Sequence, residues 1–519
     1  MSAPRTRRDF LADVGRGMLV AAVGFEVSNE LGFGTVFADE SETLTFGAIE
    51  PLVCLMQQTP ATKLMPTLIE KLQAGTEIKQ LVGAAALANA RTFGGEDYVG
   101  FHTMMALSPA YQMSLELPKE LQPLPVLKVL YRNTNRIQEH GGRKSEVLHR
   151  VKAAELGSDR AAHDILHDQV RNKDVNAAEA TLAAIAQRSP EDAFNELLYT
   201  VHDHTEVHRV VMPYRAWDLL NVVGKEQAHT MLRQSVRYCV QAESWNYPAR
   251  SDDPRTLLPK LLDEHKLLGK APGERAAEDA WVDQLSQTIF KSSPEQAAGA
   301  VAAALAEGMQ PAAIGEALTL AANQLVLRDM GRRPNEEIAG KPIGSVHGDS
   351  IGVHATDSAN AWRNMARASN TRNGFASLIL GAYQVSLDRT QRGGDFLNWQ
   401  PLPLTQHVNQ IKATDADGLI RETEEAIRGN LQARASAIVQ RYGDLGHSPR
   451  AMFDLLLKYA VSEDGALHAE KFYRTCSDEF SSTRAAFRWR HVVALARVTA
   501  SEFGRAAAGV AEARALLKV

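Results

Sequence analysis

The stretch Ile185–Leu198, with the sequence IAQRSPEDAFNELL, contains the signals that decide the fold. Its apolar residues fall at helical spacing on both sides of a break at Ser189–Pro190. Serine is a favoured N-cap residue, and proline and acidic residues suit the first turn of a helix. The stretch therefore predicts a helix, a short turn and a second helix.

Three other stretches of the chain have a related pattern. Leu305–Leu318 and His447–Leu457 match it most closely, and Leu72–Leu81 matches it more loosely. Self-similarity at several places along one chain indicates a repeat architecture. We therefore expect four degenerate copies of one helical unit.

The rest of the chain also favours helix. Alanine, leucine, glutamate and glutamine dominate, and the β-branched alternation that marks strands is scarce. The chain has 519 residues, of which 45% are hydrophobic, so it can bury a large core. We predict one all-α domain over residues 39–519, with loops over 243–275 and 331–350. Its four repeats are expected at about 45–135, 136–245, 275–400 and 410–519.

A histidine that directly follows an apolar residue comes after each copy of the pattern. The four pairs are Phe101-His102, Val207-His208, Val353-His354 and Leu467-His468. An aspartate lies four or five residues upstream of each histidine: Asp97, Asp203, Asp349 and Asp464. Four such pairs in register with an independent pattern indicate equivalent positions in the repeats.

Equivalent histidines on a repeat fold can converge on one site. Neutral imidazole is the commonest protein ligand for zinc, copper and non-haem iron. We predict a transition-metal site, with iron or copper favoured and zinc or manganese possible. Its expected ligands are His102, His204, His208, His354 and His468, and His208 and His354 are also the expected catalytic residues. His204 is included because one helical turn would separate it from His208.

The four aspartates are predicted to accept hydrogen bonds from the outer ring nitrogens and so to orient the ligands. The glycines at 348 and 352 are expected to allow close backbone approach near His354. A structural interpretation stays open, in which the aspartates are N-caps and the histidines fill polar gaps in the core. His163 and His167 are expected on a solvated helix face, and His491 at a cationic pocket edge.

The helix–turn–helix pattern resembles the unit of the carboxymuconolactone decarboxylase and alkylhydroperoxidase-D-like families, over about 40 residues per copy. The resemblance implies helical units, but the reactive CxxC pair of the peroxidase branch is absent here. Spaced histidines on a long helical chain are also distantly similar to questin-oxidase-like proteins, which use a reduced nicotinamide. No catalytic residue is carried over from these families.

The N-terminus has the features of an export signal. Thr6–Leu11 contains a twin-arginine pattern at Arg7-Arg8, and a moderately apolar stretch, Met18–Val23, follows it. Val36–Ala38 places small residues at the positions that a signal peptidase recognises. We predict a twin-arginine signal peptide over residues 1–38. The protein would then be recognised by the Tat translocase and delivered to the periplasm or the extracellular space.

Other classes of function find no support in the sequence. The formal net charge is −5 and basic runs are absent, so no nucleic-acid partner is expected. The three cysteines are far apart and form neither a CxxC motif nor a disulfide framework. No stable membrane span is expected, because the apolar part of the signal is short and interrupted by Gly24 and Glu26.

These features together predict an exported, metal-dependent enzyme, an oxidoreductase acting on a small molecule. Folded export suits a protein whose cofactor is inserted before it crosses the membrane. Two alternatives remain open. One is a metal-free hydrolase or lyase that uses histidine–aspartate pairs as general bases. The other is a helical-repeat binding protein without catalytic activity.

Overall fold

The computed structural model describes residues 43–519, except 246–249, 251, 339–340 and 392–393. Every regular element within these ranges is a helix, and β-pairing is limited there to three isolated bridges. The prediction of an all-α chain is therefore confirmed. Phe46–Val519 forms one compact unit. The expected signal peptide lies outside the described residues.

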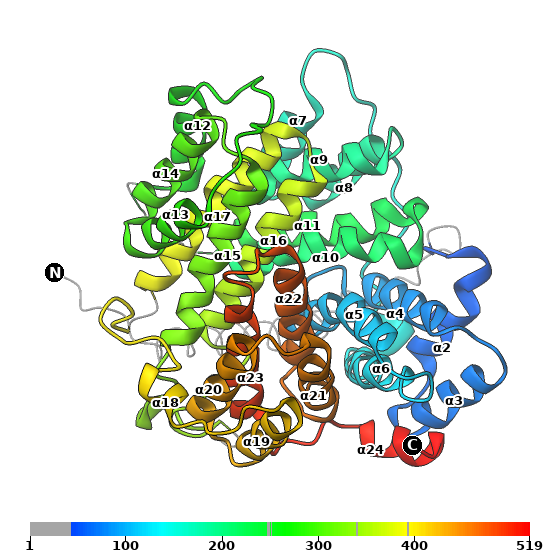
Figure 1. The fold of residues 1–519 in the computed structure, drawn as a ribbon. Coiled ribbons are helices and arrows are strands. Elements are labelled where there is room, and N and C mark those ends of the chain that lie inside the picture. Colours follow the sequence, from blue (N-terminus) through cyan, green and yellow to red (C-terminus); the bar gives the residue numbers. More distant parts are fainter. Residues whose placement is uncertain (1–42, 246–249, 251, 339–340, 392–393) are drawn as a thin grey trace. The chain divides into compact units, whose positions relative to one another are not determined.

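The helices follow one another along the chain as Figure 1 shows. The first group is α2 (Glu50–Gln58), α3 (Ala61–Gln73), α4 (Ile78–Phe93), α5 (Tyr98–Glu116) and α6 (Pro123–Glu139). The second is α7 (Ala162–Arg171), α8 (Val175–Ala186), α9 (Pro190–Val201), α10 (Val207–Val223), α11 (Ala228–Ala242) and α12 (Pro254–Glu264). The third is α13 (Asp279–Lys291), α14 (Pro294–Ala306), α15 (Pro311–Arg328), α16 (Ile351–Ala368), α17 (Thr371–Gln391) and α18 (Thr405–Asn409). The fourth is α19 (Ala416–Arg428), α20 (Gln432–Asp444), α21 (Pro449–Ser462), α22 (His468–Ser482), α23 (Trp489–Glu502) and α24 (Val510–Leu517).

A helix that carries one of the four histidines follows each helix–turn–helix pair. The four sets are α3–α4–α5, α8–α9–α10, α14–α15–α16 and α20–α21–α22. The helices are thus in the order that the repeat pattern predicts. A structural symmetry between the sets stays a prediction.

The turns within these pairs follow capping chemistry, although not at every expected residue. Ser189 caps α9 and accepts a hydrogen bond of 2.9 Å from the backbone N–H of Asp192, with Pro190 in the first helical position. The N-cap of α4 is Glu77, which forms a capping box with Gln80. At α15 the N-cap is Gln310. These helices therefore begin with a proline in the first turn or with a capping box, and different residue types occupy the N-cap position.

The four histidine-bearing helices pack against one another in a closed ring. Helix α5 contacts α10 and α22, and α16 contacts the same two helices from the other side. Figure 1 shows the four near the centre of the view, with the other helices around them. The interior of the ring contains both apolar and polar residues, and polar ones among them form the site described below.

One predicted loop is wrong in part. The segment 243–275 contains α12, because Asp253 caps the backbone N–H of Arg255, Pro254 suits the first turn, and buried leucines follow at helical spacing. The segment 331–350 is, apart from the short 3-10 helix η5 (Pro334–Glu336), a connection between α15 and α16, as predicted. Within the described ranges, none of the helices has the length and apolar character needed to span a bilayer.

The contact between α15 and α16 depends on Gly352. A Cβ atom added there would lie 2.5 Å from the backbone nitrogen of Val326. We predict that Gly352→Ala destabilises the fold by about 2 kcal/mol or more, because two backbones would have to move apart. Thermal unfolding followed by circular dichroism measures this effect.

Gly299 provides the matched control, since it lies within α14 and a Cβ there would meet nothing within 4 Å. Gly299→Ala should stabilise the protein by about 0.5–1 kcal/mol, as alanine usually does in a helix. Equal effects of the two substitutions would contradict the packing of α15 on α16.

Candidate functional site

Four histidines from four separate helices meet inside the ring. The ring centroids of His102 and His208 are 4.8 Å apart, and those of His102 and His468 are 5.3 Å apart. His354 lies 5.2 Å from His468 and 6.1 Å from His208 by the same measure. The Nε2 atoms of His354 and His468 are 3.2 Å apart. We call these four residues the histidine cluster.

Helix starts position all four side chains of the cluster. His468 is the first residue of α22 and His208 the second of α10, while His354 and His102 follow within the next few residues of α16 and α5. The starts of four helices therefore face one region. The positive ends of the four helix dipoles make it electropositive, which disfavours protonated imidazole.

A glycine permits the close approach of two of these segments, as expected for this loop. Gly348 precedes α16, and a Cβ atom there would lie 2.1 Å from the Cβ of His468. The absence of a side chain at this position allows the loop before α16 to lie directly against the start of α22.

The outer ring nitrogens of three cluster histidines have fixed partners. His102 Nδ1 lies 2.7 Å from the backbone oxygen of Tyr98, and His468 Nδ1 lies 3.1 Å from that of Ala466. His208 Nδ1 lies 2.7 Å from Oε1 of Glu206. Because carbonyl and carboxylate oxygens only accept, each Nδ1 must carry the proton and donate. Each Nε2 then presents a lone pair.

Two of these lone pairs are buried without a partner. Nε2 of His102 and Nε2 of His208 have no hydrogen-bond partner among the described residues. Leaving a buried polar atom unpaired costs free energy, so such atoms often mark a place where a ligand binds. In these three histidines the proton is thus on the outer nitrogen and the acceptor atom faces inward, whereas the hydrogen bond to Nε2 of His468 requires Nε2 of His354 to donate.

Burial disfavours the protonated form of two cluster histidines, His102 and His468. Burial lowers the pKa of His102 well below its ordinary value, and the nearby charges of Lys471 and His208 lower it further. The pKa of His468 is lowered in the same direction by burial, Lys471 and the other cluster histidines. Neutral imidazole is the form that binds a metal ion or accepts a proton.

The imidazole nitrogens of the cluster are suitable ligands for a transition metal, but their present spacing does not form a complete metal site. Among the described residues, no three His, Cys, Asp or Glu side chains are grouped closely enough to hold a metal ion as they stand. The distance of 3.2 Å between Nε2 of His354 and of His468, however, is close to the roughly 3.3 Å that separates two nitrogens on a tetrahedral ion. Small movements of His102 and His208 would be needed to complete a four-nitrogen set.

Three of the aspartates that the spacing singles out do not orient the rings. Each of the four is bonded to an arginine from another segment: Asp97 to Arg136, Asp203 to Arg171, Asp349 to Arg332 and Asp464 to Arg132. Asp97 also caps α5 through the backbone N–H of Gly100, in agreement with the structural interpretation. For Asp97, Asp203 and Asp464 the prediction that these carboxylates hold the outer nitrogens is wrong, because backbone oxygens and Glu206 occupy those positions. For Asp349 and His354 it stays a prediction.

His204 does not join the cluster either. Residues 202–206 form a turn before α10, so His204 and His208 do not share a helix face. Nε2 of His204 lies 3.0 Å from a guanidinium nitrogen of Arg255. Burial and the charges of Arg209 and Arg255 lower the pKa of His204 to about 4.

Glu206 and two tyrosines belong to the site although the sequence pattern did not reveal them. Glu206 accepts from His208 Nδ1, from two backbone N–H groups at the start of α10 and from the Tyr238 hydroxyl at 2.8 Å. Tyr98 lies with its ring 4.4 Å from that of His102 and is 46% exposed, so it separates the cluster from solvent. In the sequence, Glu206 could have been identified as a site residue from its position two residues before His208.

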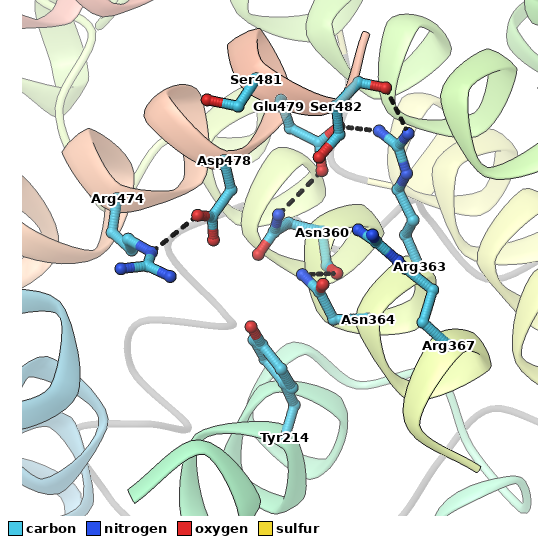
Figure 2. Close-up of a pocket in the computed structure, with 10 residues that line it drawn as sticks. All are labelled: Tyr214, Asn360, Arg363, Asn364, Arg367, Arg474, Asp478, Glu479, Ser481 and Ser482. Carbon is cyan, nitrogen blue, oxygen red and sulfur yellow. Dashed lines mark hydrogen bonds and ion pairs between the residues drawn. The ribbon is translucent and has the colours of Figure 1, made fainter. Parts of the chain in front are cut away.

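A polar pocket of about 220 Å³ lies farther along three of the same helices (Figure 2). Tyr214, Asn360 and Arg474 line it, and each comes six residues after a cluster histidine on its own helix. Six helical residues span about 9 Å along the axis. The pocket and the histidine cluster are therefore at different levels of α10, α16 and α22.

Ion pairs hold the walls of this pocket. Arg474 and Asp478 are 2.8 Å apart, and Arg363 pairs with Glu479, which also accepts from Asn360 at 2.8 Å. Figure 2 shows these pairs on one side of the pocket, with Tyr214 opposite them.

The remaining candidate histidines lie elsewhere. His163 and His167 are on α7 and are each paired with a carboxylate, Glu196 and Asp203 respectively. His491 is fully buried, and burial lowers its pKa to about 4, so it is not a cationic pocket edge.

Comparison with known proteins adds no assignment. No family model matches the chain, and no curated protein or solved structure matches it.

The carboxyl of Glu206 gives a test of the site's electrostatics. Burial alone would raise its pKa, but the charge and hydrogen bond of His208, the N–H of Arg209 and the Tyr238 hydroxyl lower it to about 2. Its pKa is thus lower in the folded chain than in the unfolded chain. The carboxylate therefore stabilises the fold above about pH 4.5, and this stabilisation is lost as the pH falls towards 2.

We predict that Glu206→Gln removes about 2 kcal/mol of this pH-dependent stability. Urea unfolding at pH 7 and at pH 3 measures the difference between the variant and the wild type. Glu295→Gln, at an exposed carboxylate, is the control and should leave the pH dependence unchanged. An identical loss on acidification in wild type and Glu206→Gln would rule out this role of Glu206.

Proposed function

We propose that this protein is an exported, metal-dependent oxidoreductase whose transition metal is held by His102, His208, His354 and His468. The observation that carries the proposal is the convergence of four imidazoles with three outer nitrogens fixed by acceptors. In metal sites the outer nitrogen of a histidine ligand usually donates to a carbonyl or carboxylate, as these three do.

The chemistry of the donor set favours iron or copper. Imidazole nitrogen suits copper, iron and zinc, whereas manganese prefers oxygen ligands. When bound, iron or copper would supply a change of oxidation state, which is the basis for proposing an oxidoreductase.

The chain's own residues have definite tasks in this proposal. Glu206 accepts the His208 proton and holds that ring, and the Tyr238 hydroxyl donates to the second oxygen of Glu206. This chain of hydrogen bonds fixes the proton of His208 on the outer nitrogen. Tyr98 covers His102 and limits the access of water from that side.

A second candidate function is supported by the same contact. The Glu206–His208 pair has the geometry of an acid–base dyad, in which a carboxylate orients an imidazole that takes a proton from a substrate. A metal-free hydrolase or lyase would use His208 in this way. Metal content distinguishes the two candidates.

Elemental analysis of the protein from its exported compartment should find about one equivalent of iron, copper or zinc per chain. His208→Ala and His354→Ala should each lower the metal content at least tenfold with little loss of helix content, because each removes an inward nitrogen. His163→Ala, on α7, is the control and should retain the metal. Wild-type protein without metal, prepared without chelators, would favour the metal-free dyad.

Export depends on the paired arginines near the N-terminus in this proposal. Replacing both Arg7 and Arg8 with lysine should keep the protein in the cytoplasm, because the Tat system requires the arginine pair. Cell fractionation and immunoblotting measure the distribution. Replacing Arg5 with lysine is the control, and normal export of the double variant would contradict the signal.

A further inference from the structure

A short series of aromatic rings leads from the histidine cluster to the surface of the protein. The ring centroids of His208 and Tyr238 are 6.4 Å apart, and those of Tyr238 and Trp245 are 5.5 Å apart. Centroid distances of about 4.5–7 Å are those of packed aromatic pairs, so each ring contacts the next. We call His208, Tyr238 and Trp245 the aromatic series.

A fourth ring strengthens the inner part of this series. The ring centroid of Phe101 lies 5.0 Å from that of His208 and 5.4 Å from that of Tyr238. Phe101 therefore packs against both rings and helps to hold them at a fixed distance from each other. The inner part of the aromatic series belongs to the same packed interior as the histidine cluster.

The outer two members of the series differ in exposure. Tyr238 lies on α11 and is 2% exposed, whereas Trp245, three residues after the end of this helix, is 40% exposed. A molecule in the solvent can therefore touch Trp245 but not Tyr238. Electron transfer between separated groups slows steeply with distance, so two ring contacts offer a faster route to His208 than one long step from the solvent.

The hydroxyl of Tyr238 already has an acceptor for its proton. It donates a hydrogen bond of 2.8 Å to Oε2 of Glu206, while Oε1 of the same carboxylate lies 2.7 Å from His208 Nδ1. A phenol that has lost an electron is a much stronger acid than a carboxylic acid, so its proton would pass to Glu206 along this bond. Oxidation of Tyr238 then leaves no positive charge on a buried ring, which would be costly.

We propose that Trp245 and Tyr238 conduct single electrons to the histidine cluster from an external one-electron donor that reaches the protein at Trp245. This inference rests on the proposed function, because the cluster can take up the electron only when it holds iron or copper in the higher oxidation state. It deepens that function by naming a second substrate class, a reductant that acts at the surface and does not enter the interior.

Electrons and protons balance in each step of this transfer. Tyr238 gives one electron to the metal centre, its O–H bond breaks, and the proton forms an O–H bond with Oε2 of Glu206. Trp245 then gives one electron to Tyr238, and the proton returns from Glu206 to restore the phenol. The external donor finally gives one electron to the Trp245 radical cation. The sum is the transfer of one electron from the donor to the metal centre.

Photo-oxidation of the metal-free full chain tests the aromatic series without the metal. Flash excitation of tris(bipyridine)ruthenium(II), with persulfate as the electron acceptor, produces a one-electron oxidant in solution, and EPR spectroscopy identifies the radical that remains. All proteins compared carry Tyr98→Phe, because Tyr98 is exposed and contacts His102. A tyrosyl radical should persist in this background, since the buried ring of Tyr238 cannot meet a second radical, and additional Tyr238→Phe should remove it.

Substitutions at Trp245 distinguish electron transfer from packing. Trp245→Phe should lose the persistent tyrosyl signal, whereas Trp245→Tyr, which keeps an oxidisable ring, should retain it. Trp399→Phe is the matched control, because Trp399 is a partly exposed tryptophan that packs on Phe396, and its signal should equal that of the background protein.

Two results would overturn the proposal: the lack of a persistent radical at Tyr238, or equal signals from Trp245→Phe and Trp245→Tyr. Elemental analysis of the wild type is a separate measurement, so failure of the aromatic series and failure of the metal site can be told apart. A Tyr238 radical that depends on Trp245 supports the electron route even in protein prepared without metal.

Discussion

The packing of four helix starts into one closed ring is the constraint on which the rest of the site depends. It brings four imidazoles within contact of one another. Burial, the charge of Lys471 and the neighbouring histidines lower the pKa of His102 and of His468. The missing side chain at Gly348 lets the start of α22 approach the loop before α16. The burial, proximity and orientation of the rings therefore have a common structural origin.

Ion pairs join the helices of the ring to one another and to their neighbours. Arg363 on α16 pairs with Glu479 on α22, and Lys128 on α6 pairs with Glu470 on α22. Removing one member of such a buried pair would leave the other charge without compensation, so these contacts fix which helices lie side by side.

The histidine cluster could be predicted from the sequence because its residues recur at equivalent positions of a repeated pattern. The four apolar–histidine pairs were found because they recur in register, and His102, His208, His354 and His468 do meet. The same reasoning failed for Asp97, Asp203 and Asp464, since proximity in sequence does not show which arginine from a distant segment will attract a carboxylate. At a helix start the nearest acceptors for a ring are backbone oxygens and side chains two to four residues earlier, as Tyr98, Glu206 and Ala466 show.

The ring of helices also has a consequence for the order of folding. The contact between His102 and His468 joins residues 366 positions apart (468 − 102), so the ring closes only when the last quarter of the chain is in place. Contacts of such long range form late and slowly, because a large loop must be ordered first. On a ribosome the first three histidines would emerge and meet while the fourth is still missing. The complete set of four inward nitrogens is thus a feature of the finished chain, and no folding intermediate that lacks α22 can possess it.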